Sequence, residues 1–531
     1  MTVAQSMAMP RNFRVLIGVC AISLGAQAAF AQLPTPPSPW RPPIGLPAPP
    51  FGVVERAGTA TYYIDNTSSS ATDSSNPNGS VTQPRVTIPA SFPAGAVVEV
   101  RGGPYSIGYI SWSSGGTASA PVFIKGVGMP ILRGGSDSRI AMAGANLIVE
   151  GFVFENIQIV MSPDISRFAL RFSIVRNYSP GRNGSAVALD GTDVVAFGNE
   201  VHHNGDPNSP VEIDLVGVFA MPHVNRAWII DNNIHHNGGD SVLVGAATSA
   251  EPWARFVYVG RNQMHEDREN GIDVKQSRDV ILSQNIIYGY IPRDSSSGEA
   301  IVVHNGPERV WVIGNVVAAS TLGIVCTFAK GFAVIGNVVT GIRHAATDTG
   351  YSPTTLYTGA GILTYGETQG SVVVNNTVWN SDAGISYGSG STGTEIVNNV
   401  VGGLTQASHQ IGFSSSVSLG LSKVSNNLLS GETRIRVGGS ILGCSSVTNC
   451  WTGEPMFVNA ATADFRVMLG SPAIDRGQPH PVYDQFKSLY GVDILTDYTD
   501  SPRLIGGSLD LGAAEFQSGA PTAPRNVRII R

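Results

Sequence analysis

The stretch VVAFGNEVHHNG at residues 194–205 returns, with changes, as AWIIDNNIHHNG at 227–238 and as VYVGRNQMHEDR at 257–268. The three stretches align without a gap and share an asparagine at their sixth position. Similar segments carry this asparagine through the middle of the chain, at Asn199, Asn232, Asn262, Asn285, Asn315, Asn337, Asn376 and Asn399. A repeat of about 22 to 40 residues is typical of a stacked architecture.

Each repeat contains short runs of Val and Ile, which favour strands over helices. A buried asparagine costs free energy unless its amide is hydrogen-bonded. Stacked asparagines satisfy one another and the backbone of the turn. The sequence therefore predicts an all-β protein, a parallel β-solenoid with an internal asparagine ladder.

The composition supports this architecture and limits the partners. A chain of 531 residues is too long for one ordinary globular core, whereas each rung of a solenoid contacts only its neighbours. The formal net charge is −6 and no basic run is present, so nucleic acid is not an expected partner. An anionic glycan would need local positive charge or a bound cation. We expect a monomer.

The N-terminus predicts export. Arg11 and Arg14 precede a short apolar run that ends in Ala-Phe-Ala before Gln32, which is typical of a secretory signal over residues 1–31. The run is short for a membrane span, so we expect a secreted or periplasmic protein that is not attached to a membrane. In such an oxidising compartment Cys444 and Cys450, which flank a five-residue loop, could form a disulfide. Cys326 is expected in the core.

Composition shifts divide the rest of the chain. Residues 32–55 are proline-rich and predict an extended linker. Residues 56–140 are expected to form an N-terminal β cap region, because the terminal units of a solenoid must protect the open stack. The rungs are expected over 141–431, a C-terminal cap over 432–516 and a tail over 517–531.

The asparagine repeat, together with the closing SPAIDRG at 471–477 and LDLGAAEF at 509–516, resembles secreted bacterial right-handed parallel β-helix proteins. This resemblance implies a right-handed parallel β-helix with N- and C-terminal caps. It leaves the activity open, because lyases, hydrolases, epimerases and adhesins share the fold.

The segment NGIDVKQS at 270–277 is the strongest candidate for chemistry. Side chains alternate along a strand, so Ile272 and Val274 are expected to face inward while Asp273 and Lys275 face outward, as a possible ion pair. A lysine can remove the C5 proton of a uronic acid and start β-elimination if burial or positive charge lowers its pKa. Lys275 is therefore the predicted catalytic base.

The same segment resembles the catalytic rung of β-helix polysaccharide lyases. In the pectate lyase type, the pattern D-G-F-x-x-K is matched by Asn270, Gly271, Ile272 and Lys275. In the alginate and chondroitin lyase type, an E-x-E-x-x-x-x-K rung precedes an R-H-G rung. Lys275 and the H-x-G of His304 fit that second pattern in part. Val303 stands in place of its arginine, so the substrate stays open.

The resemblance implies bound Ca²⁺, which prefers several carboxylate oxygens. The predicted ligands lie after the ladder position or before the next strand: Asp214, Asp240, Glu266 and Asp267. His236, Arg268 and His304 are predicted to bind the substrate or to assist proton transfer. Histidines return at one turn on three rungs, at His202, His203, His235, His236 and His265. Zinc binding, a stacked polar turn and sugar binding all remain open for them.

These observations predict a lyase that cleaves an acidic polysaccharide by β-elimination. Three alternatives remain. A glycoside hydrolase would use two carboxyl groups at a defined separation. A C5-epimerase would share the first proton abstraction and return the proton to the other face. A non-catalytic glycan-binding or surface-attachment solenoid would need no base.

Overall fold

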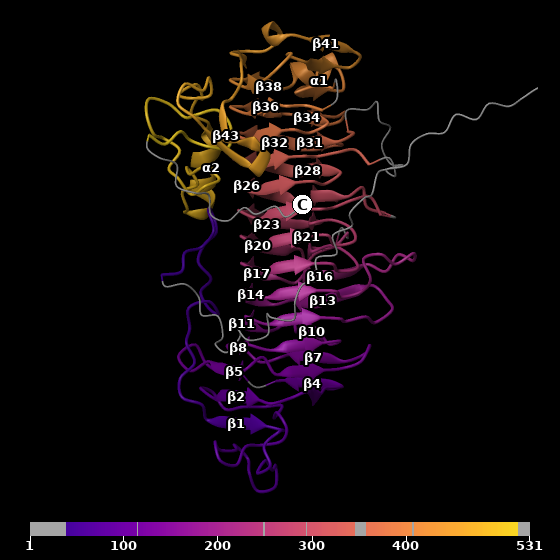
Figure 1. Cartoon of the computed structure of the whole chain (residues 1–531), viewed down its shortest axis with the longest axis vertical. Helices are drawn as coiled ribbons and strands as arrows, with labels where there is room; N and C mark the ends of the chain where they lie inside the picture. The colour runs from indigo at the N-terminus through magenta and orange to yellow at the C-terminus, as the bar shows by residue number, and fades with distance from the viewer. Residues whose placement is uncertain are drawn as a thin grey trace, which may run out of the picture.

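In a computed structural model, which describes residues 39–113, 115–247, 250–293, 295–345, 357–405 and 408–518, the chain winds into a long β-helix (Figure 1). The predicted signal peptide and nearly all of the predicted tail lie outside these residues. Three sheets of 14 strands, here named A, B and C, run the length of the stack. Each takes every third strand, so one rung supplies one strand to each sheet. The predicted right-handed parallel β-helix is confirmed.

The rungs around residues 192–303 carry the candidate site. Sheet A contains β14 (Thr192–Phe197), β17 (Asn225–Ile230), β20 (Ala254–Gly260) and β23 (Ser277–Ser283). Sheet B contains β15 (Glu200–His202), β18 (Asn233–His235), β21 (Gln263–His265) and β24 (Ile286–Tyr288). Sheet C contains β13 (Gly184–Leu189), β16 (Leu215–Ala220), β19 (Val242–Val244), β22 (Ile272–Val274) and β25 (Glu299–Val303).

The interior is a continuous column of Val, Ile and Leu side chains. In β22, Ile272 and Val274 are fully buried and face inward, as the alternation predicts. The parallel register places Val244, Val274 and Val303 directly above one another in sheet C. Residues of successive rungs that follow these strands on the outer face are therefore also stacked one above another. Cys326 lies in this core, as predicted.

The predicted asparagine ladder runs along the turn between sheets A and B. Each Nδ2 donates to the Oδ1 of the next asparagine at 2.9–3.0 Å, and each backbone N–H donates to that same oxygen. All eight predicted asparagines take part, and Asn427 adds a ninth. The ladder thus satisfies polar groups that are removed from water and fixes the register of the rungs.

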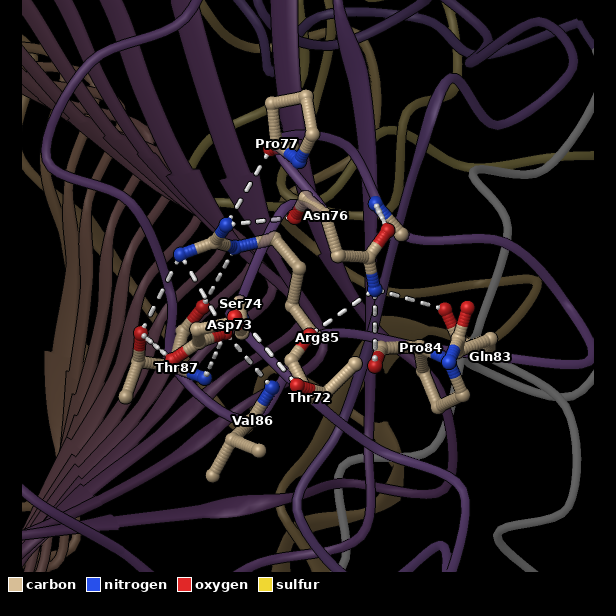
Figure 2. Close-up of polar contacts among 11 residues, drawn as sticks. Thr72, Asp73, Ser74, Asn76, Pro77, Gln83, Pro84, Arg85, Val86 and Thr87 are labelled. Atoms are coloured by element: carbon tan, nitrogen blue, oxygen red, sulfur yellow. Dashed lines mark hydrogen bonds and ion pairs between the residues drawn. The ribbon is translucent and has the colours of Figure 1, made fainter.

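A loop over residues 66–87 covers the first open strand edge at β1 (Tyr62–Asp65). The backbone N–H of Arg85 donates to the Tyr63 carbonyl, and that of Asp65 donates to the Arg85 carbonyl, in place of a further rung. Figure 2 shows how the loop is held: the Asp73 carboxylate accepts hydrogen bonds from Val86 and Thr87, and the Arg85 guanidinium donates to two backbone carbonyls. Exposed strand edges otherwise promote aggregation.

Regular rungs begin earlier than expected, because β1 and β2 (Val97–Arg101) already belong to sheet A. The region 56–140, expected as a cap, therefore supplies the capping loop and also the first rungs. The expected linker also differs. Residues 39–55 are extended but pack on sheet A, where the buried Arg171 pairs with Glu150 and donates to the carbonyls of Gly52 and Glu55.

The C-terminal region covers a side of the helix as well as its end. The end is closed by β41 (Ser440–Leu442), which pairs antiparallel with β40 (Ile435–Val437), and by the Cys444–Cys450 disulfide. The chain then folds back, and α2 (Pro481–Tyr490) packs on sheet A near β26 (Glu308–Ile313), far from β41 (Figure 1). Only the first part of the expected cap over 432–516 is therefore a cap of the stack.

Replacing Asn285 with alanine is expected to lower the free energy of unfolding by several kcal/mol. The change leaves the backbone N–H and Nδ2 of Asn262 without their acceptor, and each unsatisfied buried group costs about 1–3 kcal/mol. Urea denaturation followed by circular dichroism measures the change. The exposed Asn225→Ala is the control, expected within about 0.5 kcal/mol of wild type. Equal loss in both variants would contradict a stabilising ladder.

Candidate functional site

Three carboxylates meet on the outer side of sheet C, just before its strands. Asp214 precedes β16, Asp240 precedes β19, and Glu269 precedes β22, so they come from three successive rungs. One oxygen from each lies within 4.8 Å of the others. We call these three residues the acidic patch. It contains two of the four predicted metal ligands, Asp214 and Asp240, together with Glu269, which was not predicted.

Two of the three residues of the acidic patch are buried, and two of its oxygens have no hydrogen-bond partner. Asp240 is 1% exposed and Glu269 is 8% exposed. Oδ1 of Asp214 and Oε1 of Glu269 accept no hydrogen bond. Gly239 leaves room for Asp214, because a Cβ there would lie 2.2 Å from Oδ1. Buried polar atoms are rarely left unsatisfied, so these two oxygens indicate a missing partner.

Burial and mutual repulsion raise the pKa of each carboxyl group in the acidic patch. Burial, followed by the charges of Asp214 and other nearby carboxylates, raises the pKa of Glu269 to about 8. Burial and Asp273 raise the pKa of Asp240 well above its ordinary value. Nearby, burial raises the pKa of Glu299 to about 7. The patch therefore favours binding of either protons or a cation.

Lys275 follows β22 and lies beside this patch. Its Nζ is 3.1 Å from Oδ2 of Asp273, so the two side chains form an ion pair. Oδ1 of the same aspartate lies 2.8 Å from Nε2 of His304, on the next rung. Asp273 is nearly buried, whereas the side chains of Lys275 and His304 are 22% and 30% exposed. The aspartate thus holds an amine and an imidazole side by side at the surface.

The pKa of Lys275 is raised, whereas a base was expected to have a lowered one. Burial acts to lower this pKa, but the charges of Asp273, Asp240 and Asp214 outweigh it. Arg268 and Arg278 are the arginines nearest to Lys275 in the sequence. The former donates to the Ser209 carbonyl at 3.3 Å, and the latter pairs with Glu251 and Glu308. The surroundings of the amine are therefore acidic.

The remaining predicted residues lie elsewhere. His236 and Glu266 lie among histidines at the turn after sheet B, where His236 Nε2 is 3.6 Å from Glu266 Oε2. The pKa of His202 in this turn is lowered to about 4, chiefly by burial. Burial also lowers the pKa of His236 and His265.

Asp267 faces the interior and continues a second, shorter ladder. Nδ2 of Asn204 donates to Asn237, and Nδ2 of Asn237 donates to Oδ1 of Asp267, both at 2.8 Å. Oδ2 of Asp267 contacts Ser241 and Tyr290. Burial raises the pKa of this carboxyl group to about 7. Asp267 thus takes the ladder position that Asn204 and Asn237 hold in the two preceding rungs. It does not join Asp214 and Asp240.

Alignment of the rungs by strand register does not identify Glu269, for a geometric reason. The register places Asn270, and not Glu269, opposite Asp240, and Asn270 Nδ2 donates to Asp240 Oδ1 at 2.9 Å. Glu269 lies one residue earlier, and its longer side chain reaches the same point. An acidic residue next to the aligned position, in Glu269-Asn270-Gly271, was the signal available in the sequence.

Residues 253–412 match the model of a family described as periplasmic copper-binding protein NosD. No curated protein matches the sequence. Among solved structures, the chain is similar to pectate lyase Pel9A, with 14% identity, a TM-score of 0.45, and coverage of 87% of this chain and 98% of that one. Among the described residues, neither helix has the length and apolar character needed to cross a membrane.

Two further solved structures are similar at the same level. The alginate lyase AlyGC of family PL6 has 15% identity, a TM-score of 0.48, and coverage of 70% of this chain and 52% of that one. The PL6 polysaccharide lyase Pedsa3628 from Pseudopedobacter saltans has 14% identity, a TM-score of 0.40, and coverage of 80% and 95%. At such identities the likeness concerns the fold, and the chemistry must be argued from the residues of this chain.

In the presence of a chelator, the free energy of unfolding is expected to fall as the pH rises from about 4.5 to about 7. The pKa of Glu299 is about 7 in the folded chain, above its ordinary 4.5, so its proton stabilises the fold and is lost over this range. Glu299→Gln should lose less stability there, by up to about 3 kcal/mol.

Urea denaturation at a series of pH values measures this dependence. Other buried acids act in the same direction, so the comparison is between variants. Exposed Glu367→Gln serves as the control and should follow wild type. An identical pH dependence in Glu299→Gln and wild type would contradict the burial of an ionisable carboxyl group at this site.

Proposed function

We propose that this protein is a polysaccharide lyase, which cleaves a polymer containing uronic acids by β-elimination at the acidic patch. The observation that carries the proposal is the partly exposed amine of Lys275, held by Asp273 next to buried carboxylates with unpartnered oxygens. This arrangement supports a base and a cation site on adjacent rungs, the two elements that elimination from a uronate needs.

The residues of the acidic patch fit Ca²⁺. Calcium prefers oxygen ligands at about 2.3–2.6 Å, so two ligands of one ion lie no more than about 5 Å apart. The three carboxylates meet this limit, and two of them have an oxygen with no other partner. We assign Asp214, Asp240 and Glu269 as ligands, and not Glu266 or Asp267. Bound calcium would attract the uronate carboxylate and neutralise the charges that raise the pKa of Lys275.

Lys275 is suited to act as the base once those charges are neutralised. Burial already acts to lower its pKa, and two of the three aspartates that oppose burial belong to the acidic patch. The neutral amine then takes the C5 proton of the uronate, and the electron pair forms the C4–C5 double bond as the C4–O bond breaks. The departing oxygen receives a proton, which we assign to His304 on the next rung.

Two other residues support this role. Asp273 accepts from Lys275 and His304 through different oxygens, and so fixes the distance between base and acid. Arg268 is buried next to Asp214, with its guanidinium directed to Ser209 in the loop before β16. We assign Arg268 to positioning that loop against the substrate. His236 has no part in this site.

The carboxylate spacing alone does not separate a lyase from a retaining glycoside hydrolase, so the products must. The two carboxyl groups of such enzymes are about 5–5.5 Å apart in retaining forms and about 6.5–9.5 Å apart in inverting forms. One oxygen of each residue in the acidic patch lies within 4.8 Å of the others, which suits a shared cation. A C5-epimerase would use the same base, so the product distinguishes it from a lyase.

Lys275→Ala and Lys275→Arg are expected to lose about 100- to 10,000-fold in turnover, the usual contribution of a general base. Wild type and variants are incubated with pectate, alginate and glycosaminoglycans, and the ultraviolet absorbance of the unsaturated product is followed. Lys330→Ala, at an exposed lysine of sheet A, is the control and should keep full activity.

The products test the reaction class in the same experiment. New reducing ends without ultraviolet absorbance would indicate hydrolysis. Changed uronate stereochemistry without cleavage would indicate an epimerase. Glycan binding without either would indicate an attachment protein. Full activity of a folded Lys275→Ala variant would exclude Lys275 as the base.

The double variant Asp214→Asn, Glu269→Gln is expected to bind Ca²⁺ at least about tenfold more weakly, because ligand charge sets calcium affinity. Isothermal titration calorimetry measures this. The exposed Asp137→Asn is the control and should bind as wild type does. Unchanged calcium affinity in the double variant would contradict a calcium site at the acidic patch.

A further inference from the structure

Imidazoles form two columns along the turn that follows sheet B, apart from the acidic patch. His202, His235 and His265 end β15, β18 and β21 and lie in register. The next residue in each rung, His203, His236 or Glu266, has a positive φ of 53–58°. We call these six residues the histidine turn. Because all rungs turn in the same way, the second column is aligned as closely as the first.

Within each rung the two columns face each other through ligand atoms. Nδ1 of His202 lies 2.7 Å from Nδ1 of His203, and Nδ1 of His235 lies 2.9 Å from Nδ1 of His236. In the third rung Nδ1 of His265 lies 3.1 Å from Oε2 of Glu266. Two groups therefore have their ligand atoms within 4.8 Å: His202, His203 and His235, and His236, His265 and Glu266.

Each of the two columns stacks along the turn. The rings of His202, His235 and His265 stack on one another and on Tyr288, with centroids 4.8–5.1 Å apart. In the second column, the rings of His203 and His236 stack on each other in the same way, with centroids 5.1 Å apart. The rings of His203 and His236 stand at 87–88° to their partners in the same rung, which brings Nδ1 to Nδ1. That edge-to-edge approach is the arrangement of two ligands around one ion.

The distances fit metal ligation. Two nitrogens bound at right angles at about 2.0 Å from an ion lie about 2.8 Å apart, and the two Nδ1 pairs are 2.7 and 2.9 Å apart. In neutral imidazoles one nitrogen of each pair must carry the shared proton, which an ion would replace. Nε2 of His235 lies 3.4 Å from Glu200, a contact that directs its other nitrogen toward His236.

We propose that the histidine turn binds a divalent transition-metal ion, with His235 and His236 as the central ligand pair. Imidazole-rich sites select copper, nickel and zinc over calcium, and right-angled pairs favour copper and nickel. The site is open to solvent, because His203 and Glu266 are exposed. It stands independently of the proposed lyase activity and of the family match, which begins at residue 253 and includes only the third rung.

Titration of the full chain with Cu²⁺, followed by calorimetry and electron paramagnetic resonance, tests this. Wild type is expected to show nitrogen hyperfine structure from more than one imidazole and to retain the ion in excess Ca²⁺. The double variant His235→Ala, His236→Ala should bind at least about tenfold more weakly. The exposed His223→Ala, outside the histidine turn, is the control and should bind as wild type does.

A second variant covers the case in which the double variant does not fold. His203→Ala changes an exposed side chain at one end of the turn, and should alter the nitrogen hyperfine pattern while circular dichroism stays unchanged. The proposal is overturned if folded histidine variants bind Cu²⁺ as wild type does. It is also overturned if Asp214→Asn, Glu269→Gln removes the copper, which would place the ion at the acidic patch.

Discussion

The hydrogen bond from one asparagine amide to the next is the constraint on which the molecule depends. Nine amides bond in sequence inside the turn between sheets A and B, and a shift of one rung by a single residue would break the chain of bonds. The register they impose is also the register of the outer surface. Residues from rungs far apart in sequence can therefore act at one point although loops of different length separate them.

In our proposals, sheet C and the turn after sheet B use this register for opposite kinds of ligand. The acidic patch gathers carboxylate oxygens, which suit a hard cation such as calcium, whereas the histidine turn gathers nitrogens, which suit softer ions. Asp240 and His236 are four residues apart in one rung, so a single repeat supplies both. The raised pKa of Lys275 connects the acidic patch to the proposed base, because the carboxylates proposed to bind a cation also hold the proton on the amine.

The sequence was sufficient for the repeat and for parts of the site, because these depend on periodicity. The asparagine ladder follows from the repeat, and the inward Ile272 and Val274 follow from alternation along a strand. Alternation does not predict how far a side chain extends, nor which residues after a strand turn into the interior. Glu269 joins the acidic patch through its length, and Asp267 turns inward to end a second ladder. The docking of residues 39–55 and of α2 depends on long-range contacts that carry no local signal.

The most direct test of the account is a crystal structure of the Lys275→Ala variant with Ca²⁺ and a uronic acid oligosaccharide. We predict an ion bound by Asp214, Asp240 and Glu269, with a uronate carboxylate beside it and C5 facing the position left by the amine. An ion bound elsewhere, with the sugar on another sheet, would contradict the account. So would a shifted register that separates the three carboxylates.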